Sequence, residues 1–290
     1  MPELPEVETI VRDLRPHLLG HRVVSAEVAE PGVLRYPDRG DFLRRIRGRR
    51  MDHVGRHGKF MLVELGGQGQ GELLVLHLGM TGRLSIQPAG TEVVPHTHLR
   101  LHLSTGQELR LQDYRRFGRV LLGGALELAE AGMLPALGPE PDTDALPNPP
   151  HWGRFALRLT PRLFDAALAR SRRAVKAVLL DQAALAGVGN IYADEACFRA
   201  GVRPHAVASR LGPARRRRLY EAIGAALAGA VDLRGTTFDD YRDAHGEKGA
   251  NQHRLQVYGR AGLPCLRCGA LLRRSTIAGR TTVHCPRCQH

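Results

Sequence analysis

A group of four cysteines near the C-terminus restricts the fold more than any other feature of the sequence. Cys265 and Cys268 form one C-x2-C pair, Cys285 and Cys288 form a second, and 16 residues separate the pairs. Each pair fits a tight turn, and two such turns can bring four thiolates to a tetrahedral Zn²⁺ with a short hairpin between them. Four protein ligands leave no open coordination position, so we expect one structural zinc ion. Two disulfides, which a reducing compartment disfavours, and an iron–sulfur cluster are the alternatives.

The composition is strongly basic. The 290 residues include 42 Lys and Arg against 29 Asp and Glu, which gives a formal net charge of +13 at pH 7. This balance favours an acidic polymer as partner, although a solvated arginine-rich surface would produce the same excess. No apolar run reaches the 18 residues of a membrane span, and the N-terminus lacks the basic head and apolar core of a signal peptide. We therefore expect a cytoplasmic protein with no membrane partner.

The N-terminus has the composition of a nucleophilic site. Pro2 follows Met1 directly and precedes Glu3. Removal of Met1, expected before a small residue, would leave a secondary amine whose pKa of about 8 is far below the value of about 10.4 for lysine. Such an amine can attack a sugar carbon and form an iminium when a carboxyl group nearby moves protons, and Glu3 is the candidate. Pro and Glu residues are also common in the first turn of a helix, which is the alternative interpretation.

The hydrophobic pattern changes along the chain from one typical of strands to one typical of helices. A first helix is expected at 5–18, and short apolar runs broken by glycine predict an antiparallel sandwich. Six prolines at 134–151 mark a linker, and helical periodicity follows it, with Cys197 expected as a small core residue. The predicted strands are 22–28, 60–65, 73–78, 99–103, 108–112 and 120–122, and the later helices are 161–169, 172–184, 190–200 and 213–231.

A glycine turn in the helical half offers a phosphate site. Gly187-Val-Gly-Asn190 separates two predicted helices. Glycines allow a close backbone approach, and Asn190 stands where a helix start presents free N–H groups to an anion. An ordinary N-cap after a turn would have the same sequence.

Eight short segments, in unchanged order from end to end, make the chain similar to the bacterial formamidopyrimidine-DNA glycosylases. They read PELPEVET at 2–9, GRHGKF at 55–60, HLGMTG at 77–82, RRFG at 115–118, LGPEP at 137–141, GVGNIYADE at 187–195, VYGRAGLPC at 257–265 and CPRCQ at 285–289. The resemblance implies an α+β protein with a catalytic β-sandwich and flanking helices at 1–133 and a linker at 134–151. It further implies a helix-two-turn-helix DNA-binding domain at 152–254, with a lesion-recognition loop at about 236–253, and a β-hairpin zinc finger at 255–290.

The resemblance also implies an activity and its residues. The protein would remove oxidised purines, chiefly 8-oxoguanine opposite cytosine and formamidopyrimidines, and then cut the abasic strand of double-stranded DNA by β- and δ-elimination. Pro2 would attack C1′, Glu3 would supply protons, Lys59 would serve the β-elimination, and Arg280 would bind phosphate and serve the δ-elimination.

The implied DNA contacts come from several motifs. An enzyme that extrudes a nucleotide must fill the hole, and the matching residues here are Met80, Arg115 and Phe117. The implied phosphate contacts are Asn190, His77, His96 and Lys176, and the recognition loop would contribute Thr236 and Tyr241.

One departure bears on function. The family commonly has DPRRFG, whereas this chain has Tyr114 in place of the proline. Because proline restricts the backbone, this departure bears on the stiffness expected of the loop at 113–118. Two other functions are open: an endonuclease VIII-type glycosylase for oxidised pyrimidines, whose opening usually has Gly where this chain has Leu4, and a non-catalytic zinc-finger protein that binds damaged DNA. We expect a monomer, because no coiled-coil or long apolar seam is evident.

Overall fold

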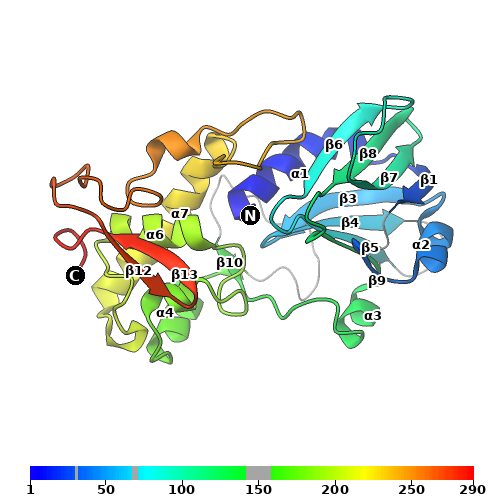
Figure 1. Cartoon of the computed structure of the whole chain (residues 1–290). Coiled ribbons are helices and arrows are strands. Elements are labelled where there is room, and N and C mark those ends of the chain that lie inside the picture. The colour runs from blue at the N-terminus through cyan, green and yellow to red at the C-terminus, as the bar shows by residue number, and fades with distance from the viewer. Residues whose placement is uncertain (30–31, 67–70, 142–157) are drawn as a thin grey trace. The chain divides into compact units, whose positions relative to one another are not determined.

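The structure is a computed structural model that describes residues 1–29, 32–66, 71–141 and 158–290 (Figure 1). These residues form two compact units: unit 1 comprises Met1–Pro135 and Arg234–Gly249, and unit 2 comprises Ala136–Leu233 and Ala250–His290. Residues 142–151 of the expected linker lie outside the described residues. Within the described ranges no helix is long and apolar enough to cross a membrane.

Unit 1 is built on two β-sheets, as the alternating apolar pattern predicts. Both contribute leucines and valines to one buried core, so the predicted sandwich is confirmed. The four-stranded sheet has the order β1 (Val23–Val28), β7 (Thr97–Leu103), β8 (Gln107–Gln112), β6 (Arg83–Pro88). The five-stranded sheet has the order β2 (Leu34–Tyr36), β9 (Arg119–Gly124), β5 (Glu72–His77), β4 (Phe60–Gly66), β3 (Arg50–His57), and only its β2–β9 pair is parallel.

Helix α1 (Leu4–Leu18) packs its apolar stripe on this core and against β3, close to the predicted bounds 5–18. Two short helices, α2 (Arg39–Ile46) and α3 (Ala125–Glu130), complete the N-terminal part of unit 1. The strands β2, β3 and β6 were not predicted from the sequence. Strand β3 does not alternate, because Arg56 and His57 are buried in it.

The segment Arg234–Gly249 packs with unit 1, although the expected domain boundaries placed all of it in the helix-two-turn-helix domain at 152–254. The Arg234 guanidinium lies 2.7 Å from the Asp13 carboxylate on α1, and the backbone N–H of Thr236 donates to the Glu6 carboxylate at 2.8 Å. The Tyr241 hydroxyl donates to the carbonyl oxygen of Arg234 at 3.0 Å. These contacts fix the segment beside α1.

Unit 2 is helical and ends in a hairpin. Its helices α4 (Pro161–Ala169), α6 (Asn190–Ala200) and α7 (Pro213–Asp232) match the predicted bounds closely. The helix predicted at 172–184 is wrong in length: α5 spans only Val175–Leu179, and the Asp181 carboxylate then accepts from the N–H of Ala183 to form a turn. The remaining elements are β10 (Glu140–Pro141), β11 (Arg158–Leu159), η2 (Ala208–Arg210), η3 (Asn251–Arg254), β12 (Arg273–Ile277) and β13 (Arg280–His284).

Candidate active site

Pro2 and Glu3 lie buried at the start of α1, and Glu3 is only 3% exposed. The Glu6 carboxylate organises this start. Its Oε2 accepts from the backbone N–H of Glu3 at 2.8 Å, and its Oε1 accepts from the backbone N–H of Thr236 at 2.8 Å. One carboxylate therefore holds both the helix start and the segment Arg234–Gly249.

Lys59 stands in the turn between β3 and β4, directly after Gly58, whose φ of 57° suits glycine. The ammonium-bearing side chain is largely buried, at 7% exposure. Arg56 on β3 pairs with Glu8 on α1 at 2.7 Å, and both side chains are at most 3% exposed. This buried ion pair holds the strand that leads to Lys59 against α1.

His77 ends β5 as a neutral imidazole. Its ring lies 4.6 Å from the ring of Phe60, and its Nδ1 accepts from the N–H of Gly79 at 3.1 Å. Burial, together with the positive charges of Arg119 and Lys59, lowers the pKa of His77 to about 4. With Nδ1 accepting, the ring proton is on Nε2, which makes Nε2 a hydrogen-bond donor.

Two loops of unit 1 are joined through the buried Asp113. Its carboxylate accepts from the Thr81 hydroxyl in one loop and from the N–H of Gly118, at 2.6 Å, in the other. Gly79 allows a further close approach: a Cβ there would lie 2.5 Å from the carbonyl carbon of Phe117. The HLGMTG and RRFG motifs therefore form one framework.

This framework presents large side chains to solvent. Met80 is 41% exposed and Phe117 is 48% exposed, while the Arg115 guanidinium lies 4.6 Å above the Phe117 ring. Most apolar side chains of this size are buried, so exposed ones held on a rigid loop favour contact with a partner. His96, also exposed, precedes β7 with a φ of 65°.

Tyr114, the departure from the family motif, contacts the predicted recognition segment. Its hydroxyl donates to the Asp240 carboxylate at 3.1 Å, and this hydrogen bond is exposed to solvent. Thr236 and Tyr241, by contrast, are buried at 4% and 8% exposure. Burial raises the pKa of Tyr241, and its hydroxyl is engaged with backbone oxygens. Neither of these two side chains offers an exposed face for a base.

Lys176 in unit 2 is fully buried. Its ammonium lies 2.7 Å from the Asp194 carboxylate, and it donates to the Thr281 carbonyl and the Thr282 hydroxyl, each at 2.9 Å. Burial raises the pKa of Asp194 to about 6, against the opposing effect of Lys176. The ammonium has no exposed surface in this structure, and the phosphate contact that the resemblance implies for Lys176 stays a prediction.

The same hairpin carries Arg280. Arg280 is exposed at the start of β13, after a turn in which Ala278 and Gly279 have positive φ values. The side-chain amide of Asn190, at the start of α6, donates to the Thr281 carbonyl at 3.0 Å. Unit 2 therefore brings Asn190 next to the hairpin residues that follow Arg280.

The four cysteines of the two C-x2-C pairs converge at the other end of this hairpin. Their sulfur atoms all lie within 4.8 Å of one another, with 4.0 Å between the Sγ atoms of Cys265 and Cys288 and 3.5 Å between those of Cys268 and Cys285. Zn–S bonds of about 2.3 Å in a tetrahedron place sulfur atoms about 3.8 Å apart, whereas a disulfide needs about 2.05 Å. The geometry fits one structural zinc ion and excludes the two disulfides. Cys197 is fully buried in α6, which confirms it as a core residue.

Comparison with known proteins identifies the family. The Formamidopyrimidine-DNA glycosylase N-terminal domain model matches residues 1–120, the Formamidopyrimidine-DNA glycosylase H2TH domain model matches 153–242, and the zinc finger found in FPG and IleRS matches 262–290. The Formamidopyrimidine-DNA glycosylase of Desulforamulus reducens is 40% identical over 290 residues, covering 100% of this chain and 99% of that protein. The chain belongs to the formamidopyrimidine-DNA glycosylase family.

Solved structures of the family agree with this fold. The MutM (FPG) protein from Thermus thermophilus is 42% identical, with a TM-score of 0.81 over 99% of this chain and 98% of that one. A Lactococcus lactis FPG variant in complex with a Fapy-dG containing DNA is 30% identical, with a TM-score of 0.86 over the whole of both chains. The predicted α+β class, with a β-sandwich, a helix-two-turn-helix domain and a zinc hairpin, is confirmed.

Several residues of this family member organise the site without having been assigned a role from the sequence. Glu6, Asp113 and Asp194 are buried carboxylates that accept from backbone N–H groups. Glu6 and Asp194 lie inside the quoted motifs, but nothing in those motifs names their partners. The structure alone supplies them.

Proposed function

We propose that this chain is a bifunctional DNA glycosylase and abasic-site lyase of base-excision repair that acts on oxidised purines in double-stranded DNA. The observation that carries the proposal is the start of α1, where Pro2 and Glu3 are buried within a full-length match to the family. The preferred substrates would be 8-oxoguanine opposite cytosine and formamidopyrimidines. We expect the protein to act as a monomer in the cytoplasm, at the nucleoid.

The chemistry begins at Pro2 once Met1 has been removed. The secondary amine attacks C1′ of the damaged nucleotide, the bond from C1′ to the base breaks, and the base leaves with the electron pair and a proton. Glu3 supplies a proton to the sugar ring oxygen as the ring opens, which leaves an iminium between Pro2 and C1′. The hydrogen bond of 2.8 Å from the Glu3 backbone N–H to the Glu6 carboxylate, which fixes the Glu3 backbone, supports this role.

Strand cleavage follows by two eliminations. Loss of a C2′ proton to a base allows the 3′ phosphate to leave, and Lys59, in the turn after β3, is the proposed residue for this step. A second elimination releases the 5′ phosphate, and Arg280 is the proposed residue that binds it. The product is a one-nucleotide gap with phosphate on both ends.

The exposed side chains of Met80, Arg115 and Phe117 support nucleotide extrusion. A base inside a duplex must leave the stack before an enzyme can act on it, and apolar side chains can fill the vacated position. Met80 and Phe117 are proposed to do this, while Arg115 bonds the orphaned cytosine. His77, His96 and Asn190 are proposed phosphate contacts, which position the duplex without reading its sequence.

Lesion recognition is proposed for the segment that begins at Thr236. The Thr236 and Tyr241 side chains are buried, so we propose that they hold the segment in place and that its backbone meets the base. Lys176 is proposed to position the hairpin that carries Arg280.

The decisive experiment is borohydride trapping followed by mass spectrometry of the crosslinked residue. Duplexes would carry 8-oxoguanine opposite cytosine, 8-oxoguanine opposite adenine, or an oxidised pyrimidine. We expect an adduct on Pro2 that is strongest for 8-oxoguanine opposite cytosine, and none for a Pro2→Gly variant under the same conditions. An adduct mainly on the pyrimidine lesion would support an endonuclease VIII-type enzyme, and binding without an adduct would support a non-catalytic protein.

A further inference from the structure

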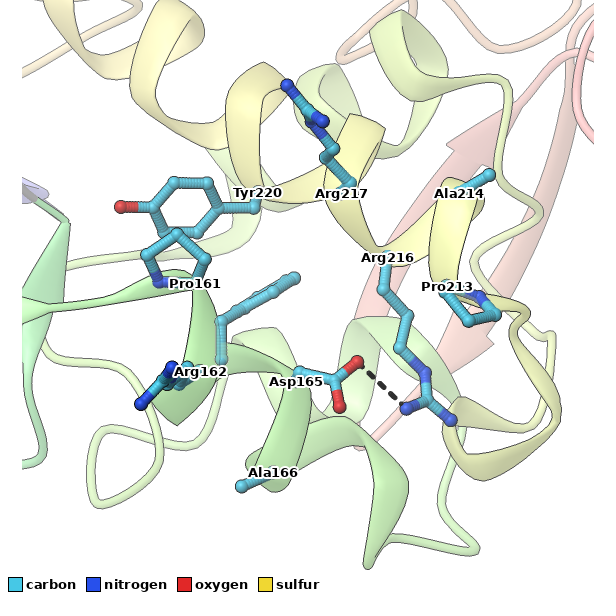
Figure 2. Close-up of a pocket in the computed structure, with 10 residues that line it drawn as sticks. Pro161, Arg162, Asp165, Ala166, Pro213, Ala214, Arg216, Arg217 and Tyr220 are labelled. Atoms are coloured by element: carbon cyan, nitrogen blue, oxygen red, sulfur yellow. Dashed lines mark hydrogen bonds and ion pairs between the residues drawn. The ribbon is translucent and has the colours of Figure 1, made fainter.

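Unit 2 contains a pocket that no step of the proposed repair reaction uses. Its volume is about 830 Å³, and it lies between α4 and the first turns of α7 (Figure 2). Tyr220 supplies aromatic surface and packs against Phe164, which is 1% exposed, with the ring centroids 5.7 Å apart. Pro161 and Pro213, the first residues of the two helices, add apolar surface. None of the proposed DNA contacts lines this pocket.

Of the four charged residues that line the pocket, three are arginines and one, Asp165, is acidic. Both α4 and α7 lack an acidic residue in the first turn, although the N-terminal end of a helix carries a partial positive charge. Instead, α7 places four consecutive arginines at positions 215–218. Two of them, Arg216 and Arg217, line the pocket together with Arg162 from α4. An anionic occupant would offset this accumulation of positive charge.

Arg216 and Arg217 differ in how much of their charge an occupant could reach. Arg216 is largely engaged within the protein: its guanidinium pairs with Asp165 at 2.9 Å, marked by the dashed line in Figure 2, and donates to the Ser209 carbonyl at 3.1 Å. Arg217 pairs with Glu221 at 2.9 Å on the surface, where its side chain is 82% exposed. An exposed pair of this kind is weak and readily exchanges one carboxylate for another.

We propose that this pocket binds an acidic peptide segment of a partner protein, with an aromatic or large aliphatic side chain seated against Tyr220, Pro161 and Pro213. Carboxylates beside the anchor would contact Arg162 and Arg217. The apolar surface favours a peptide over a DNA backbone, because a phosphodiester chain has no apolar group to bury there. The proposal does not depend on the proposed repair activity.

Fluorescence polarisation with the full-length, zinc-loaded protein tests the proposal. The probe is a short labelled peptide of aspartates that flank a phenylalanine–leucine pair, and the comparison peptide has alanines in place of that pair. We expect saturable binding of the probe and at least about tenfold weaker binding of the alanine peptide, as for loss of an anchor residue. Equal binding of the two peptides would show attraction by charge alone and would overturn the proposal.

Variants locate the binding. Arg217→Glu reverses the charge at the pocket and should fold, because the Arg217 side chain is 82% exposed. Ala166→Trp fills the pocket from α4. Each should weaken probe binding at least about tenfold, while Arg35→Glu, the same charge change at the exposed position of β2 in unit 1, should not. Probe binding that survives both pocket variants would refute the site. Loss of duplex-DNA affinity in Arg217→Glu, with DNA competing against the probe, would instead assign the pocket to nucleic acid and also overturn the proposal.

Discussion

Replacing Lys176 with methionine should loosen the hairpin that carries Arg280. The ammonium contacts Asp194, the Thr281 carbonyl and the Thr282 hydroxyl, with no surface exposed to water. Its loss leaves the Asp194 carboxylate buried with only the N–H of Val283 as a described hydrogen-bond donor. Breaking a buried ion pair by removing one partner costs about 3–5 kcal/mol. A cost of about 3 kcal/mol corresponds to a factor of about 100 in the local opening equilibrium.

Hydrogen–deuterium exchange of the Val283 amide measures this opening directly. We expect at least about 100-fold faster exchange in Lys176→Met and no change in the control Lys248→Met, which alters an exposed lysine. Removing both charges, in Lys176→Met with Asp194→Leu, should restore most of the free energy of unfolding, because an apolar pair of similar volume avoids the buried charge. Thermal melts measure this rescue, since the Val283 amide loses its acceptor in the double variant. Unchanged exchange in the single variant would refute the positioning role of Lys176.

The same variant should show a defined pH dependence. Burial already raises the pKa of Asp194 to about 6, so between about pH 4 and pH 6 the carboxyl ionises in the unfolded state but not in the folded state, and the free energy of unfolding falls as the pH rises. Without Lys176 the pKa of Asp194 rises further, so the pH range over which the free energy of unfolding falls extends toward neutral pH. The stability deficit of Lys176→Met should therefore be smaller at pH 6 than at pH 8, and a deficit independent of pH would show that Asp194 is not its source.

Three further predictions concern unit 1. The pKa of His77 lies near 4, so as the pH falls its imidazole is protonated in the unfolded state before it is protonated in the folded state. His77 should therefore lower the free energy of unfolding by up to about 3 kcal/mol between about pH 6.5 and pH 4, and thermal melts of His77→Asn should lose that part of the pH dependence. Tyr114→Phe removes the hydrogen bond to Asp240 and should change the preference for cytosine over adenine opposite 8-oxoguanine by about fivefold at most, measured as kcat/KM on the two duplexes, while a larger loss of cleavage on both would indicate damage to the loop itself. Asp113→Ala should remove the hydrogen bonds that join the loop of Thr81 to the loop of Gly118. Single-turnover base release should fall by about tenfold or more, with zinc content unchanged.

The elements with a strong apolar period could be predicted from the sequence. Helix α1 and strands such as β4 and β5 follow from buried leucines and valines at regular spacing. Strand β3 could not be predicted in this way, because Arg56 is buried there against Glu8 on another element. The four cysteines indicated the zinc site directly, since thiolate spacing carries the geometry of the metal.

The buried carboxylates show why the rest of the site could not be predicted. Glu6 accepts from Thr236, 230 residues away, and Asp194 accepts from Val283, 89 residues away. In each case the donor is a backbone N–H, which every residue except proline possesses, so no side-chain pattern marks the partner. A sequence motif shows which carboxylates are present, but only the folded structure shows which strand or loop each carboxylate contacts. The recognition segment therefore packs with the catalytic unit, because Glu6 beside Glu3 provides an acceptor that only the folded chain brings within reach.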